Sequence, residues 1–188
     1  MLNLPNFLTL VRILTIPVFL VLLSSDLYLE AFVVFVIGGL TDALDGAVAR
    51  MTHQETALGT YLDPVADKLL VMSSFAVLGL TGAIPAWLAV LVIVRDIILL
   101  LGYVTIFLYF SERLEVQPSL VGKLNTLCQL VTIGTVLVLL YNPAFLPRHV
   151  LTALILATTT TTVVSGFQYI YRGLVWLQNR TPTVGDLS

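Results

Sequence analysis

Four aspartates lie close together between long apolar runs, in a chain that is otherwise poor in charge. They are Asp42, Asp45, Asp63 and Asp67, with Glu55 between them. Acidic side chains next to lipid-soluble sequence are energetically costly, so they indicate a function or a bound partner. Carboxylate oxygens suit hard cations such as Mg²⁺, Mn²⁺ or Ca²⁺, and the four aspartates are therefore candidate metal ligands.

The first two aspartates belong to a predicted helical face that has room for a ligand. Asp42, Asp45, Gly46 and Ala49 are spaced i, i+3, i+4 and i+7, which puts them on one side of a helix. The small residues Gly46 and Ala49 would let a flat ligand approach the backbone. Arg50 offers a guanidinium fork for a phosphate.

The other two aspartates predict a second face, on the next helix. Gly59, Asp63 and Asp67 repeat every four residues and therefore share one side. If a short loop joins the two helices, both faces can point at each other and the four carboxylates converge. Like charges this close repel each other unless a cation neutralises them. The alternative is a pair of helix ends whose acids are merely solvated, which leaves the constellation and both glycines unexplained.

This arrangement resembles the motif of the CDP-alcohol phosphatidyltransferase family at every fixed position. The motif here reads Asp42-x2-Asp45-Gly46-x2-Ala49-Arg50-x8-Gly59-x3-Asp63-x3-Asp67. The resemblance implies a reaction in which a hydroxyl attacks the lipid-linked phosphate of CDP-diacylglycerol and CMP leaves. A pair of metal ions about 4 Å apart can neutralise a pyrophosphate and hold the attacking and leaving oxygens.

The same resemblance implies a role for each motif residue. The residues implied to hold Mg²⁺ or Mn²⁺, as a pair of ions, are Asp42, Asp45, Asp63 and Asp67. Asp67 is also the family's candidate general base for the acceptor hydroxyl. The residues implied to cradle the cytidine and its phosphates are Asp42, Gly46, Ala49, Arg50 and Gly59.

Composition predicts that these residues are held by membrane-spanning helices. The chain has 188 residues, of which 58% are hydrophobic and only 11% are charged, whereas a soluble domain is about a quarter charged. A spanning helix needs about 20 mostly apolar residues, which leaves room for about six spans and no separate soluble domain. We therefore expect an all-α integral membrane protein. Its expected surroundings are the lipid bilayer, and we expect it to bind no nucleic acid.

The order of apolar runs and breaks gives the expected elements. A short amphipathic segment over residues 1–12 lies along the membrane interface. Residues 1–172 form the membrane domain and residues 173–188 a polar tail. The six spans are expected at residues 13–23, 28–50, 59–80, 86–110, 120–141 and 150–171. The threonines from Thr158 to Thr162 are interpreted as a helix-packing surface, placed at a homodimer contact.

The distribution of Lys and Arg predicts the orientation. Six spans put both termini on one side, and that side or its vicinity holds most of the cations: Arg12, Arg50, Lys68, Arg113, Lys123, Arg172 and Arg180. The opposite turns hold only Arg148. Under the positive-inside rule, the termini and the acidic motif face the cytoplasm of a bacterial inner membrane or the matrix of a mitochondrial inner membrane.

Polar residues beyond the motif are expected to bind the acceptor. Arg95 and Lys123 are predicted to contact a phosphate of the acceptor, with Asn125 and Arg12 nearby. Arg12 serves equally well as an anchor to lipid headgroups. A structural ion pair between Arg95 and Asp96 is the alternative for that position, although adjacent helix residues do not face each other.

Within the family, one stretch distinguishes two acceptors. Arg95-Asp96-x2-Leu99 and Gln117-Pro118-Ser119-x2-Gly122-Lys123-Leu124-Asn125-Thr126-x2-Gln129-Leu130 resemble the cardiolipin synthases of mitochondrial type. Phosphatidylglycerophosphate synthases are similar but usually have Arg-Glu, with another Arg about two turns later, where this chain has Val104. We favour phosphatidylglycerol as acceptor, with cardiolipin as product. Glycerol 3-phosphate is the alternative acceptor.

An ion-coupled membrane transporter is the alternative from a different functional class, because such proteins also place acids within the membrane. Against it, the two halves of the chain show no matching repeat, and the acids gather at one membrane face.

Overall fold

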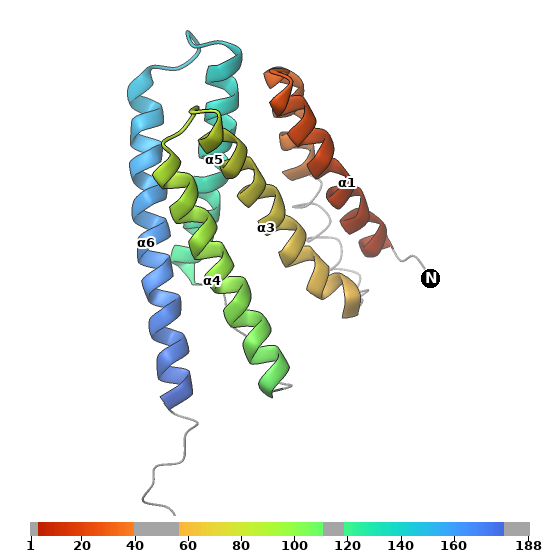
Figure 1. Ribbon diagram of the computed structural model, residues 1–188, viewed down its shortest axis with the longest axis vertical. Helices are drawn as coiled ribbons and strands as arrows, with labels where there is room; N and C mark the ends of the chain where they lie inside the picture. Colours follow the sequence, from red (N-terminus) through yellow and green to blue (C-terminus); the bar gives the residue numbers. More distant parts are fainter. Residues whose placement is uncertain (1–3, 40–56, 111–118, 179–188) are drawn as a thin grey trace, which may run out of the picture.

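The computed structural model describes residues 4–39, 57–110 and 119–178, and nearly all of these residues are helical (Figure 1). The helices are α1 (Leu4–Ser24), a helix over Tyr28–Gly39, α3 (Ala57–Leu80), α4 (Ala86–Phe110), α5 (Leu120–Tyr141) and α6 (Arg148–Gln178). The expected all-α class is confirmed for this part of the chain.

The helices form a bundle in which α3 and α4 run in opposite directions, as do α5 and α6 (Figure 1). α3 packs against both α1 and α4, α4 packs against α6, and α6 packs against α5. The beginnings of α1, α3 and α5 lie toward one end of the bundle, together with the ends of α4 and α6. Residues at the starts of odd-numbered helices are therefore brought near residues at the ends of even-numbered ones.

Local signals explain why the helices begin and end where they do. Gly82 has a φ of +76°, a conformation that favours glycine, and it lies in the turn before Pro85 and α4. Ser119 caps α5, because its side-chain oxygen accepts a hydrogen bond of 3.0 Å from the backbone nitrogen of Gly122. The predicted spans at 86–110 and 120–141 match α4 and α5, and the span at 59–80 matches α3 to within two residues.

Two expected boundaries are corrected by the structure. Residues 4–12 belong to α1 and are continuous with the first span, so they do not form a separate segment. Pro5 permits this because it lies in the first turn, where a missing backbone N–H breaks no helical hydrogen bond. α6 continues to Gln178 and takes in residues 173–178 of the predicted tail.

The apolar core joins most of the helices. Phe19 of α1 and Phe35 of the following helix pack with ring centroids 5.8 Å apart. The largest fully buried apolar side chains are Phe19, Phe75, Leu78, Leu88, Ile133 and Leu137. This cluster fixes α1, α3, α4 and α5 relative to one another.

Large apolar side chains also face outward along the described helices. Examples are Val21, Val90, Leu127, Leu156 and Phe167, each more than half exposed. By length and composition, Leu120–Tyr141 and Arg148–Val175 are each long and apolar enough to cross a membrane. Among the described residues, these two are the helices that meet that criterion.

Candidate functional site

The structure describes the helical backbone of the second half of the acidic motif. Gly59, Asp63 and Asp67 lie in the helical backbone of α3, and their four-residue spacing puts them along one side of it. Arg12 lies in α1. The other motif residues fall outside the described residues: Asp42, Asp45, Gly46, Ala49 and Arg50. Convergence of the four aspartates therefore stays a prediction.

An ion-paired cluster begins one residue after Asp67. Lys68 Nζ of α3 donates to Asp96 Oδ1 of α4 at 2.8 Å, and Arg95 Nη1 donates to the same oxygen at 2.6 Å. Asp96 is fully buried and Arg95 is 7% exposed. The alternative predicted for this position, an ion pair between neighbours in sequence, is therefore what the structure contains. Its acceptor-binding role stays a prediction.

This cluster has more positive than negative charge. The distances of 2.6 and 2.8 Å to one oxygen place Lys68 Nζ and Arg95 Nη1 within 5.4 Å of each other. One carboxylate serves two cations, so the three side chains carry a net charge of about +1. The second oxygen, Asp96 Oδ2, is buried without a hydrogen-bond partner. A buried site with surplus positive charge is suited to an anionic group.

Arg95 is held from two further directions. Its Nε donates to Ser165 Oγ of α6 at 3.1 Å, and its guanidinium carbon lies 5.7 Å from the ring centroid of Tyr169. A Cβ atom on Gly122 would lie 2.9 Å from the Tyr169 hydroxyl, so glycine at this position leaves room for that ring. Arg95 is thus a fixed group rather than a mobile surface cation.

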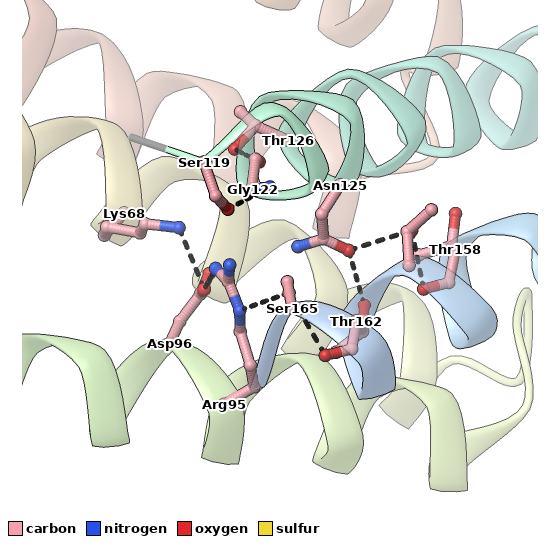
Figure 2. A network of polar contacts seen from close by, with 11 residues as sticks. Lys68, Arg95, Asp96, Ser119, Gly122, Asn125, Thr126, Thr158, Thr162 and Ser165 are labelled. Atoms are coloured by element: carbon pink, nitrogen blue, oxygen red, sulfur yellow. Dashed lines mark hydrogen bonds and ion pairs between the residues drawn. The ribbon is translucent and has the colours of Figure 1, made fainter. Parts of the chain in front are cut away.

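The contacts continue across the bundle to α5 (Figure 2). Ser165 Oγ donates to the Thr162 carbonyl at 3.2 Å, and Thr162 Oγ1 donates to Asn125 Oδ1 at 2.8 Å. We call this chain of residues the polar belt: Lys68, Asp96, Arg95, Ser165, Thr162 and Asn125. It connects α3, α4, α6 and α5 in one layer.

The order of residues along the helices locates the polar belt relative to the core. On α3, Lys68 follows Asp63 and Asp67 and precedes the core residue Phe75. On α5, Asn125 precedes the core residue Ile133. The polar belt therefore lies between the apolar core and the part of α3 that carries the motif.

The threonine-rich stretch of α6 packs against α5 of the same chain, and the homodimer contact expected for it stays a prediction. Thr159 and Thr160 donate to carbonyls one turn earlier on their own helix. Thr158 Oγ1 lies 2.8 Å from Thr132 Oγ1 of α5, and both side chains are buried. Thr161 Oγ1 donates to Asn125 Oδ1 at 3.0 Å. The polar side chains thus tie α6 to α5.

The structure does not bring every predicted acceptor residue together. Arg95 and Asn125 both belong to the polar belt, whereas Lys123 lies on the exposed side of α5. Lys68, and not Lys123, is the lysine beside Arg95. Sequence spacing missed Lys68 because its role depends on which helix packs against α3.

Arg95 can also be approached from the side of the bundle. A groove of about 390 Å³ lies between α4 and α6, and Arg95 forms part of its wall. Most of its other lining residues are apolar, including Trp87, Val94, Ile98 and Phe167. An apolar chain lying in the groove would therefore pass next to the polar belt.

Comparison with known proteins gives a family match over most of the chain. The sequence profile described as CDP-alcohol phosphatidyltransferase matches residues 2–164. A probable phosphatidylglycerophosphate synthase of Mycobacterium tuberculosis is 35% identical over 179 residues, covering 92% of this chain and 82% of the relative.

Relatives with two different names match at similar levels. The cardiolipin synthase (CMP-forming) of Homo sapiens is 33% identical over 187 residues, covering 91% of this chain and 62% of the relative. The CDP-diacylglycerol–glycerol-3-phosphate 3-phosphatidyltransferase of Bacillus subtilis is 31% identical over 160 residues, covering 77% of this chain and 80% of the relative. Sequence similarity therefore supports one reaction class and two acceptors.

Proposed function

Because this chain belongs to the CDP-alcohol phosphatidyltransferase family, we propose that it transfers the phosphatidyl group of CDP-diacylglycerol to a hydroxyl of phosphatidylglycerol. The hydroxyl oxygen forms a bond to the lipid-linked phosphorus, the bond from that phosphorus to CMP breaks, and the hydroxyl proton passes to a base. The products are cardiolipin and CMP. The family match extends over residues 2–164 and favours an enzyme over the transporter alternative.

The acidic motif supplies the donor site in this proposal. Asp42, Asp45 and Asp63 offer the oxygen ligands that Mg²⁺ or Mn²⁺ prefers, and such ions would neutralise the pyrophosphate of the donor. Asp67 takes the proton of the acceptor hydroxyl. Arg50 and three small residues hold the cytidine and its phosphates. The small residues are Gly46, Ala49 and Gly59.

The charge of the Lys68–Asp96–Arg95 cluster is the observation that carries the choice of acceptor. Two cations share one carboxylate oxygen, which leaves a net charge of about +1. The phosphodiester of phosphatidylglycerol carries one negative charge and balances it. Glycerol 3-phosphate carries nearly two and would leave the buried site short of positive charge.

The groove between α4 and α6 supports the same choice. Its apolar walls lead to Arg95 from the side of the bundle, where outward-facing residues such as Val94 and Phe167 are exposed. A lipid acceptor can bring its headgroup to the polar belt while its acyl chains stay among apolar side chains. A soluble acceptor gains nothing from such a route.

Glycerol 3-phosphate is the second candidate acceptor. It is favoured by the similarity to the synthases from Mycobacterium tuberculosis and Bacillus subtilis, which are named for this acceptor. Arg12 would then have to add the further positive charge that this acceptor needs, since it is predicted to lie near the acceptor.

The proposed setting is a membrane crossed by six helices. Outward-facing apolar side chains along the described helices support a lipid environment, as do the two helices long enough to span it. Both termini and the motif then face the cytoplasm or the matrix. The nucleotide part of the donor would bind from the aqueous phase on that side.

The test is a CMP-release assay with each acceptor. Purified protein in phosphatidylcholine nanodiscs receives CDP-diacylglycerol and Mg²⁺ or Mn²⁺, and then either phosphatidylglycerol or glycerol 3-phosphate. We expect CMP and cardiolipin with phosphatidylglycerol. CMP with glycerol 3-phosphate alone would assign the second candidate. A lack of CMP with every acceptor would refute the proposed reaction.

A further inference from the structure

Two amide side chains lie one turn apart on the buried side of α5. Asn125 and Gln129 are both fully buried, with 0% of each residue exposed. Their spacing of four residues places them on the same side of the helix. Thr132, the next polar residue along that side, is paired with Thr158. The two amides differ from this threonine because their hydrogen-bonding capacity is not filled.

Asn125 is held by one end only. Its Oδ1 accepts hydrogen bonds from Thr162 Oγ1 at 2.8 Å and Thr161 Oγ1 at 3.0 Å, while its Nδ2 has no partner. Figure 2 shows this nitrogen directed away from the threonines of α6. Turning the amide over would only exchange the paired end for the unpaired one. One end of Asn125 therefore stays available in either orientation.

Gln129 has no partner at either end. Both Oε1 and Nε2 are buried and lack hydrogen bonds, and Asp96 Oδ2 is in the same condition. Buried polar atoms in folded proteins are nearly always paired, so the partner of an unpaired one is a bound ligand or an ordered water. An apolar side chain at position 129 would avoid the desolvation penalty altogether.

The types of unpaired atom indicate what that molecule carries. The amides offer two nitrogen donors and one oxygen acceptor, and Asp96 Oδ2 adds a second acceptor. An anion needs donors only and a metal ion needs oxygen ligands only, whereas a hydroxyl group both donates and accepts. The set is therefore complementary to a molecule with several hydroxyl groups.

The polar belt connects Asn125 to the cationic cluster, and Gln129 lies one helical turn further along the same side of α5. Thr162 contacts Asn125, and its carbonyl accepts from Ser165, which in turn accepts from Arg95. Arg95 and Lys68 both bind Asp96 Oδ1. The Asn125 amide thus belongs to the same chain of contacts as the cationic cluster, with the Gln129 amide next to it along α5. A glycerol group next to a phosphate offers hydroxyls and a negative charge in one ligand.

We propose that Asn125 and Gln129 bind the glycerol hydroxyls of the acceptor while the Lys68–Asp96–Arg95 cluster binds its phosphate. This inference rests on the proposed function, and it holds for either acceptor because phosphatidylglycerol and glycerol 3-phosphate both join glycerol to phosphate. It assigns Gln129 as a specificity-determining residue.

The test is the variant Gln129→Met, which keeps the length of the side chain and removes its amide. We expect the melting temperature without acceptor to stay the same or rise, because an unpaired buried amide is removed. The KM for the acceptor should rise about tenfold, as expected for a lost hydrogen-bonded group. The KM for CDP-diacylglycerol should not change. About tenfold more acceptor should be needed to produce the same rise in melting temperature as in the wild type.

Thr132→Val is the matched control on the same side of α5. It removes the buried contact with Thr158 and should lower the melting temperature while leaving the KM for the acceptor unchanged. If Gln129→Met behaves like this control, the amide bridges an ordered water only and the inference is wrong. The same holds if equal acceptor concentrations raise the melting temperatures of Gln129→Met and the wild type by equal amounts. That thermal readout needs no turnover, so it separates failure of this inference from failure of the proposed reaction.

Discussion

Lys68 and Asp96 form an ion pair of 2.8 Å that joins α3 to α4 directly after Asp67. Because Asp96 is fully buried and also binds Arg95, the pair fixes the rotation of α3 about its own axis at this level. That rotation decides where the side of α3 carrying Gly59, Asp63 and Asp67 points. An ion pair outside the motif thus contributes to the geometry of the motif.

Asp96→Asn tests this relationship. The variant leaves Arg95 and Lys68 without their buried carboxylate partner. Removing one partner of a buried ion pair costs about 3–5 kcal/mol of folding stability. Lys68 is partly exposed, at 22% of its side chain, so the lower end of that range is expected. A fall in melting temperature in nanodiscs measures the effect.

Asp26→Asn is the control for Asp96→Asn. Asp26 is an exposed turn residue with a φ of 59°, a conformation that asparagine tolerates. Its substitution should leave the melting temperature nearly unchanged. Equal melting temperatures for both variants and the wild type would mean that the Lys68–Asp96 pair does not hold the bundle together.

The sequence predicts helix boundaries well where strong local signals lie. The turn with Gly82 and Pro85 separates α3 from α4, and the Ser119 cap begins α5. The end of α6 is not predictable from hydropathy. Polarity increases after residue 171, but no proline follows until residue 182, and α6 continues through Gly173 to Gln178.

The candidate site is only partly predictable, for a different reason. Fixed spacing predicts which motif residues share a side of α3, since that follows from helix geometry alone. The partner of Lys68 depends on how α3 and α4 pack, which spacing within one helix does not determine. The divergence of adjacent helix positions predicts against an Arg95–Asp96 pair, yet the long arginine side chain reaches the carboxylate of its neighbour.

Metal removal should abolish activity. Exhaustive treatment with EDTA is expected to stop CMP release, and Mg²⁺ or Mn²⁺ to restore it, because clustered acids need a cation to accept a pyrophosphate. Asp42→Asn, Asp45→Asn and Asp63→Asn should each require more metal for half-maximal activity and turn over more slowly. Insertion into the membrane should be unaffected. Full CMP release after chelation would disprove the metal requirement.

Topology reporters test the proposed orientation. A reporter fused after Ser188 and a tag inserted within residues 112–117 should both report the cytoplasmic side. A tag at Asp26, in the exposed turn after α1, should report the opposite side. A C-terminus on the opposite side from the N-terminus would require an odd number of spans and would exclude the six-helix arrangement.

Asp67→Asn tests the proposed general base. Asp67 lies one turn beyond Asp63 on the side of α3 shared with Gly59. If Asp67 takes the proton from the acceptor hydroxyl, the variant should bind CDP-diacylglycerol as the wild type does, because the other donor-binding residues are unchanged. Turnover should fall by about 10² to 10⁴, the usual effect of losing an acid–base group. Donor affinity and turnover are measured together across a titration of Mg²⁺.

The rival role for Asp67, an essential metal ligand, gives a different result in the same experiment. Donor binding and turnover would then fall together, because the donor pyrophosphate depends on the bound cation. Excess metal would raise both again by filling a weakened site. A missing base cannot be restored by mass action, so turnover that stays low at saturating Mg²⁺ with normal donor affinity assigns proton transfer to Asp67. Weak donor binding that excess metal rescues would reject that assignment.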